Sequence, residues 1–242
     1  MSPFLLSIVL GLSAALANSV GGWILVRRQW ERHYLKYFVS LGSGFMLSTA
    51  ILEMVPESIH LSAQYAPILI LCGYCLVHFF EHTLTAHFHF GEETHAEQFL
   101  HSHKSYTVML ALLVHALFDG IAIGSGFLVS KSLGLLIFFA IFLHKIPEGF
   151  TVGSVMLASG KSKMTAVNAA AGLGAATVLG VLAMHSLQSM IGLGLPLSAG
   201  VTIYVAASDL VPEVNKEPGL AMAFTFFAGV AMVFALERWL GM

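Results

Sequence analysis

The chain has 242 residues, of which 57 % are hydrophobic and only 10 % are Asp, Glu, Lys or Arg. A soluble domain usually carries about 25 % charged residues, so this composition excludes an ordinary soluble protein and favours one embedded in a lipid bilayer. The net charge of −2 gives no support to a nucleic-acid partner, and the two cysteines, Cys72 and Cys75, provide no disulfide framework.

Eight apolar runs along the chain are each long enough to cross about 30 Å of hydrocarbon as a helix. We therefore predict an all-α integral membrane protein with eight transmembrane helices in one polytopic domain, residues 1–242, with a His-rich loop at 83–105. In chain order the predicted spans cover residues 4–26, 38–59, 66–82, 106–129, 133–158, 165–187, 193–214 and 220–240.

Basic residues are divided unevenly between the two sides of the membrane. Lys131 and Arg238 fall on the side where the chain begins, and Lys145 lies within a span. The other side carries Arg27, Arg28, Arg32, Lys36, Lys104, Lys161, Lys163 and Lys216. Because Lys and Arg accumulate in cytoplasmic loops, we expect both termini outside the cytoplasm and the loop at 83–105 inside it. The plasma (inner) membrane is the expected location.

Two similar motifs lie within the fourth and fifth predicted spans. His115-Ala-Leu-Phe-Asp119-Gly120 and His144-Lys-Ile-Pro-Glu148-Gly149 each place a histidine and a carboxylate four residues apart, on one helical face. Facing each other near the bilayer centre, they offer two imidazoles and two carboxylates, which suit zinc and its neighbours. Pro147 also frees the carbonyl of Leu143, which could face the ion or a water. The alternative is a buried His–carboxylate network that holds two helices together.

Two pairs of segments repeat along the chain. Residues 115–125 resemble residues 144–154 in consecutive spans. Residues 52–57, Leu-Glu-Met-Val-Pro-Glu, resemble residues 208–213, Ser-Asp-Leu-Val-Pro-Glu, in spans two and seven. The members of each pair run in opposite directions, as in the inverted repeats of secondary transporters, whose substrate site lies near the midplane.

The second repeat also predicts carboxylates along a cation path. Glu53 and Asp209 lie deeper in their spans, and we expect them to raise the local cation concentration on that path. Glu57 and Glu213 lie nearer the ends of the spans and are left undecided between the path and helix-end packing.

These residues make the sequence similar to the ZIP (Zrt/Irt-like protein) family of divalent metal transporters, in its prokaryotic form. The resemblance rests on the two His–carboxylate motifs, the segment at 52–57, eight spans with external termini and the His-rich loop. It implies uptake of divalent metal into the cytoplasm, zinc (Zn²⁺) most commonly, with Fe²⁺, Mn²⁺, Cd²⁺ or Co²⁺ also carried by members. By this resemblance the primary metal position consists of His115, Asp119, His144 and Glu148. Alternating access would move spans one, four, five and six against two, three, seven and eight.

The sequence departs from the two-metal version of this family. Members with two metals place Asn after the first histidine and Asp after the first ligand of span five, where this chain has Ala116 and Lys145. No Asp or Glu occurs between Glu148 and Asp209 to supply the ligand that span six adds in those members. We therefore hypothesise a single metal site in which the Lys145 ammonium takes the place of a second cation. The alternative is a Lys that only packs the helices, paired to Glu148 or Asp119.

A second concentration of metal-binding side chains surrounds the loop at 83–105. His78, Glu81 and His82 share a helical face at the inner end of span three, and further imidazoles and carboxylates follow. Such a segment can hold divalent metal loosely and receive or sense released ions; the alternative is a solvated polar loop. The candidate imidazoles are His78, His82, His87, His89, His95, His101 and His103.

Two other classes of protein use similar ligands. An intramembrane zinc hydrolase needs them with an open position for a water, and a structural metalloprotein needs the bound metal alone. The inverted repeats and the glycines on the metal helices favour transport.

The expected partners are a divalent metal ion, as substrate and not as a catalytic cofactor, and the lipid bilayer; a homodimer is left open. His185 and Gln188 are expected to be surface polar groups.

Overall fold

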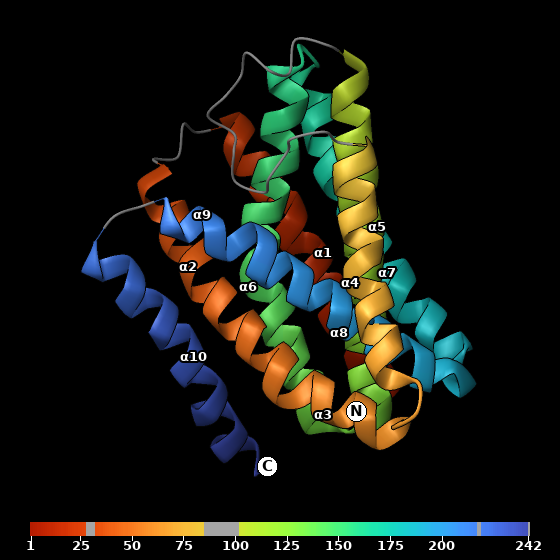
Figure 1. Cartoon of the computed structure of the whole chain (residues 1–242). Helices are drawn as coiled ribbons and strands as arrows, with labels where there is room; N and C mark the ends of the chain where they lie inside the picture. Colours follow the sequence, from red (N-terminus) through yellow and green to blue (C-terminus); the bar gives the residue numbers. More distant parts are fainter. Residues whose placement is uncertain (28–31, 85–101, 217–218, 242) are drawn as a thin grey trace.

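The computed structural model describes residues 1–27, 32–84, 102–216 and 219–241. The regular structure of this part of the chain is all helix, in one bundle (Figure 1). The helices are α1 (Pro3–Arg27), α2 (Arg32–Thr49), η1 (Ala50–Met54), α3 (Val55–Leu61), α4 (Ala66–Leu84), α5 (Ser102–Val129), α6 (Lys131–Ala158), α7 (Lys163–Ser186), η3 (Gln188–Met190), α8 (Ile191–Tyr204), η4 (Val205–Leu210), α9 (Val211–Asn215) and α10 (Leu220–Leu240).

Within the described residues, eight helical runs are long and apolar enough to cross a membrane, which confirms the eight spans predicted from the sequence. The second run, Leu35–Leu61, includes η1 and α3, and the seventh, Gln188–Asn215, joins η3, α8, η4 and α9. Phe224 and Trp239 on α10 are 70 % and 77 % exposed, as suits a surface that faces hydrocarbon and its interface. Helix α10 ends at the end of the bundle where α1 begins, as an even number of crossings requires (Figure 1).

Four pairs of helices approach each other backbone to backbone, and glycines permit this approach. A Cβ atom at any of these glycines would lie 1.9–2.2 Å from a carbonyl oxygen of the partner helix, so no larger residue fits. Small residues serve membrane helices in this way because close van der Waals packing replaces the hydrophobic drive that lipid removes. The contacts are α1 with α6 (Gly21, Gly149), α5 with α7 (Gly120, Gly180), α2 with α10 (Gly44, Gly229) and α4 with α8 (Gly73, Gly200).

These close pairs divide the bundle into two groups of helices. Helices α1, α5, α6 and α7 pack against one another, and the second group contains α2 with α10 and α4 with α8. The groups meet where α2 lies against α6 and where α8 lies against α5. At the second contact the Ser198 hydroxyl donates to the Phe118 carbonyl oxygen at 3.2 Å. The same division of spans is the one that the family resemblance implies for alternating access.

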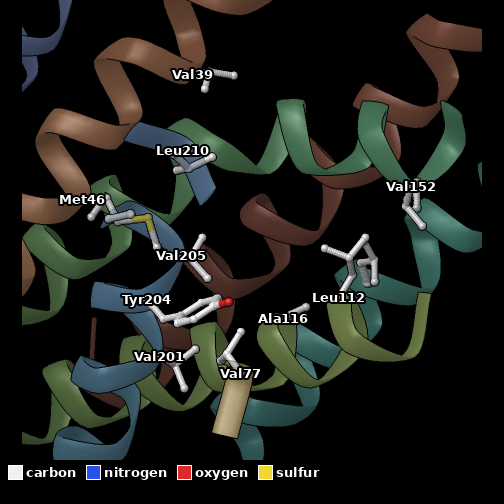
Figure 2. Packing of buried hydrophobic residues seen from close by; sticks show 14 of the residues in the cluster. Val39, Met46, Val77, Leu112, Ala116, Val152, Val201, Tyr204, Val205 and Leu210 are labelled. Carbon is white, nitrogen blue, oxygen red and sulfur yellow. The ribbon is translucent and has the colours of Figure 1, made fainter. Parts of the chain in front are cut away.

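An apolar cluster joins the two groups. It includes Met46 of α2 and Val77 of α4 from one group, and Leu112 of α5 and Val152 of α6 from the other (Figure 2). Tyr204 at the end of α8 lies in the same cluster. Burial of these side chains stabilises the conformation in which the groups are closed against each other.

The second pair of repeated segments adopts the same irregular helix twice. The π-helical turn η1 precedes Pro56, and the π-helical turn η4 precedes Pro212. Proline lacks an N–H and its ring crowds the carbonyl four residues earlier, so a widened turn relieves the clash. The two turns carry Glu53 and Asp209 at matching positions of the repeat.

Candidate metal centre

The two His–carboxylate motifs meet between α5 and α6. One ligand atom from each of His115, Asp119, His144 and Glu148 lies within 4.8 Å of the others, and the four residues are 0–3 % exposed. Among the described residues, this is the one group of three or more His, Cys, Asp or Glu side chains placed to hold a metal ion. The structure therefore brings together the four residues selected from the sequence, and their binding of metal stays a prediction.

A backbone hydrogen bond orients the His144 ring. Its Nδ1 lies 3.1 Å from the Ala140 carbonyl oxygen, which can only accept, so Nδ1 carries the proton and donates. The lone pair of Nε2 then faces Oδ2 of Asp119 at 3.4 Å. From α5, Nε2 of His115 lies 3.2 Å from the same oxygen. Proteins commonly orient a histidine ligand in this way, through the ring nitrogen that does not bind the metal.

Several polar atoms at this centre have no hydrogen-bond partner within the described part of the chain. They are both ring nitrogens of His115, Oδ1 of Asp119 and Oε1 of Glu148. Burying polar atoms without partners is costly, and most costly for charged groups. A divalent cation accepts lone pairs from nitrogen and oxygen alike, so this donor set fits a metal ion as cargo.

Lys145 lies inside the same cluster and contacts both of its carboxylates. Its Nζ is 2.5 Å from Oδ2 of Asp119 and 2.5 Å from Oε2 of Glu148, and its side chain is fully buried. The ammonium therefore contacts one oxygen of each carboxylate, and the other oxygen has no hydrogen-bond partner among the residues that the structure describes. Ala116, the second departure from the two-metal pattern, supplies no ligand and packs in the apolar cluster with Tyr204 (Figure 2).

Asn18 of α1 is a neighbour of this centre that sequence reasoning missed. The side chain is fully buried, and the two atoms that face its amide are acceptors, so its nitrogen points at them. It donates to Oε2 of Glu148 at 3.2 Å and to the Lys145 carbonyl oxygen at 2.6 Å. One signal was available: Asn18 is the sole amide side chain within the apolar first span.

The carbonyl of Leu143 lies at the contact between the two helix groups. Helix α6 continues through Pro147, and the Leu143 oxygen lies 3.7 Å from where a Cβ on Gly42 of α2 would be. The freed oxygen is therefore beside α2, at the contact between the two groups.

The carboxylates predicted near the outer end of the path have partners of their own. Glu53 in η1 interacts electrostatically with Glu237 of α10. Glu57 is half-buried, and its Oε1 lies 3.7 Å from Nδ1 of His60. Both lie outside the four-residue cluster.

The inner carboxylates also form a separate group. Asp209 is 2 % exposed, and its carboxyl interacts electrostatically with that of Glu81 of α4. Tyr204 lies beside both carboxyls and interacts electrostatically with each. Glu213 lies nearer the surface, with its Oε2 3.0 Å from Nζ of Lys216. Glu81, which the sequence placed with the histidines of span three, therefore also interacts with Asp209 of η4.

Little of the predicted His-rich segment can be placed. The rings of His78 and His82 stack with centroids 4.0 Å apart, on an exposed surface of α4. Helix α4 ends at Leu84 and α5 begins at Ser102. Four of the other predicted imidazoles lie outside the described residues: His87, His89, His95 and His101. His103 lies in α5, but the structure does not describe its side chain.

The expectation that His185 is a surface group is wrong. It is 8 % exposed, its Nε2 lies 2.6 Å from the Ser7 hydroxyl, and Phe4 packs edge-on against its ring. The start of α1 covers the end of α7, which the sequence of span six alone does not reveal. Gln188 is exposed, as expected.

Comparison with known proteins identifies the family of the chain. The family model described as ZIP Zinc transporter matches residues 2–108 and 92–237, nearly the whole chain. The chain is 26 % identical to "Zinc transporter ZIP9" of Xenopus tropicalis, over 86 % of this chain and 84 % of that protein. It is 29 % identical to "Zinc transporter ZIP13" of Danio rerio over 55 % and 41 %, and 32 % identical to "Zinc transporter SLC39A7" of Rattus norvegicus over 54 % and 31 %. The chain therefore belongs to the ZIP zinc transporter family, whose members are membrane transporters rather than enzymes.

Proposed function

We propose that this protein carries zinc across the membrane into the cytoplasm through one central site between α5 and α6. The observation that carries this proposal is the buried cluster of His115, Asp119, His144 and Glu148, three of which have polar atoms without a hydrogen-bond partner among the described residues. Relatives named as zinc transporters make zinc the first cargo to test.

The positions of the carboxylate oxygens support a single metal. Lys145 holds Oδ2 of Asp119 and Oε2 of Glu148, and the other oxygen of each carboxylate has no described partner. One zinc ion can use those free oxygens with the imidazoles while the ammonium keeps its own contacts. Lys145 then supplies the positive charge that a second ion would otherwise supply.

Alternating access is the mechanism that this packing supports best. The ligands are 0–3 % exposed, so the described conformation closes the site to both sides. Rocking of α1, α5, α6 and α7 against the other group would open the contacts that α2 makes with α6 and that α8 makes with α5. Entry from outside is supported by the excess of Lys and Arg on the side reached after the first span, which favours termini outside the cytoplasm.

The acidic groups of the π-helical turns complete the proposed path. Glu53, with Glu237, lies toward the outer end, and Asp209, with Glu81, lies toward the inner end. Glu57 and Glu213, both half-buried, are proposed as helix-end groups because each has a basic partner three residues later, at the end of its helix.

The remaining parts of the proposal concern surroundings and cargo range. They are residence in the plasma (inner) membrane, a homodimer, and one polytopic domain at 1–242. The His-rich connection predicted at 83–105, whose ends belong to α4 and α5, is proposed to lie on the cytoplasmic side. Fe²⁺, Mn²⁺, Cd²⁺ and Co²⁺ are proposed as competing cargoes. Cysteine-accessibility labelling at each end, and cross-linking in native membranes, test the orientation and the dimer.

Uptake of radioactive zinc into proteoliposomes tests the function. We expect wild type to fill the vesicles and His115→Ala to lose at least about 90 % of the initial rate. His60→Ala is the matched control, since the His60 side chain is 84 % exposed and far along the chain from the cluster. Zinc that stays bound without flux in wild type contradicts transport; unlabelled Fe²⁺, Mn²⁺ and Cd²⁺ in competition define the cargo range.

Metal counting tests the single site. Purified protein dialysed against zinc should retain one tightly held ion, which His144→Ala removes. Two ions retained at the central cluster would contradict the proposed role of Lys145.

A further inference from the structure

Asn18 lies where α1 and α6 are in backbone contact, at the metal cluster itself. A Cβ on Gly149 would come 2.0 Å from the Asn18 carbonyl oxygen, and a Cβ on Gly21 would come 2.2 Å from the Ile146 carbonyl oxygen. One glycine on each helix thus fixes α1 against the turn of α6 that carries Glu148. Asn18 is fully buried there, in a stretch of α1 without charged residues.

The amide of Asn18 makes two contacts, and both involve the same turn of α6. It donates to Oε2 of Glu148 at 3.2 Å and to the Lys145 carbonyl oxygen at 2.6 Å. Oε2 also accepts from Nζ of Lys145 at 2.5 Å, so this oxygen has two donors. Oε1 of Glu148 has no partner among the described residues.

We propose that Asn18 is a positioning residue that determines metal preference, by holding Oε2 of Glu148 so that the carboxylate binds the cation through Oε1 alone. This inference rests on the proposed function, which names zinc as the transported ion; the contacts of Asn18 are observed independently of it. A carboxylate held by one oxygen counts as one ligand, which suits the four-coordinate geometry that zinc prefers. A released carboxylate can rotate and bind through both oxygens, which suits larger ions with more ligands.

Removing the amide should therefore change which ion binds better. In Asn18→Leu the side chain keeps a similar size but donates no hydrogen bond, so Oε2 loses one of its two donors. A hydrogen bond to a charged group is worth about 1.5–3 kcal/mol, which corresponds to a factor of about 10–150. We expect the ratio of the zinc to the cadmium dissociation constant to rise at least about tenfold. The zinc KM of uptake should rise with it, while the maximal rate stays within about twofold.

Ser7→Ala is the matched control. Ser7 is also fully buried on α1 and also bonds a residue of another helix, with its hydroxyl 2.6 Å from Nε2 of His185. Its loss should lower the melting temperature without altering the zinc-to-cadmium ratio. If the branched leucine prevents folding, Asn18→Ala removes the same donor without adding bulk near Gly149.

Isothermal titration of purified protein with zinc and with cadmium, beside thermal unfolding, decides the matter. A ratio that shifts in Asn18→Leu or Asn18→Ala and not in Ser7→Ala supports positioning. A ratio within twofold of wild type, with only a lower melting temperature, overturns it and leaves Asn18 as a packing residue. The titration measures binding and needs no transport. Wild type that binds zinc without transporting it would refute the proposed function, and the ratio of the zinc to the cadmium dissociation constant would still test this inference.

Discussion

Replacing Lys145 by Met removes the ammonium between two buried carboxylates and leaves a side chain of similar length. The Nζ atom is 2.5 Å from an oxygen of Asp119 and of Glu148, and the three side chains are at most 1 % exposed. Removing one partner of a buried ion pair typically costs about 3–5 kcal/mol, because the remaining charge stays buried without compensation. For a chain of this size that corresponds to a melting temperature lower by about 6–20 °C, at about 2–4 °C per kcal/mol.

Zinc should reverse much of this loss, because the ion can supply the missing positive charge. At a zinc concentration 100 times the dissociation constant, binding stabilises a protein by about 2.7 kcal/mol, and each tenfold gain in affinity adds about 1.4 kcal/mol. We therefore expect Lys145→Met to melt early when stripped of metal and to show a larger zinc-induced rise in melting temperature than wild type.

The assay is thermal unfolding in detergent, with and without a series of zinc concentrations. Lys163→Met is the control, because Lys163 is an exposed lysine at the start of α7. A metal-free Lys145→Met that unfolds at the wild-type temperature, or a zinc-induced rise no larger than that of wild type, would refute the view that Lys145 neutralises the centre.

Three further predictions follow from the packing and the ligand chemistry. Gly200→Ala should lower the melting temperature, because its Cβ would lie 1.9 Å from a carbonyl oxygen of α4, whereas Gly192→Ala has open space and should not. Zinc uptake should fall as the outside pH falls from about 8 to 5, because only an unprotonated imidazole binds metal; constant uptake across that range would contradict histidine ligation by His115 and His144 in the limiting step. Asp209→Asn should slow uptake several-fold, since the inner path loses negative charge, while the zinc bound per protein stays at one; an unchanged rate would remove Asp209 from the path.

The spans and the four residues of the cluster could be predicted from short stretches of the sequence. In lipid every backbone N–H and C=O must be paired internally, so a long apolar run forms a helix whatever surrounds it. Histidine and carboxylate four residues apart must then share one helical face, as His115 does with Asp119 and His144 with Glu148. The two motifs lie at similar depth on adjacent antiparallel helices, so the two faces can lie opposite each other in the bundle.

Contacts between segments that are distant in the sequence could not be predicted from these local patterns. Glu81 was grouped with His78 and His82 because the three share a helical face, yet its carboxyl interacts with that of Asp209 on the seventh span. His185 was expected at the surface, since nothing in span six shows that α1 covers it. Each of these outcomes depends on the rotation of one helix against another.

The sequence by itself determined eight helices, the identity of the candidate ligands and their shared faces, because these depend on residues within four positions of each other. The tertiary structure decided that Lys145 holds one oxygen of each carboxylate, and that Asn18 reaches Glu148 from the first helix. The physical reason is that glycines such as Gly21 and Gly149 bring α1 and α6 into backbone contact, and such a contact depends on which helices meet and at which register.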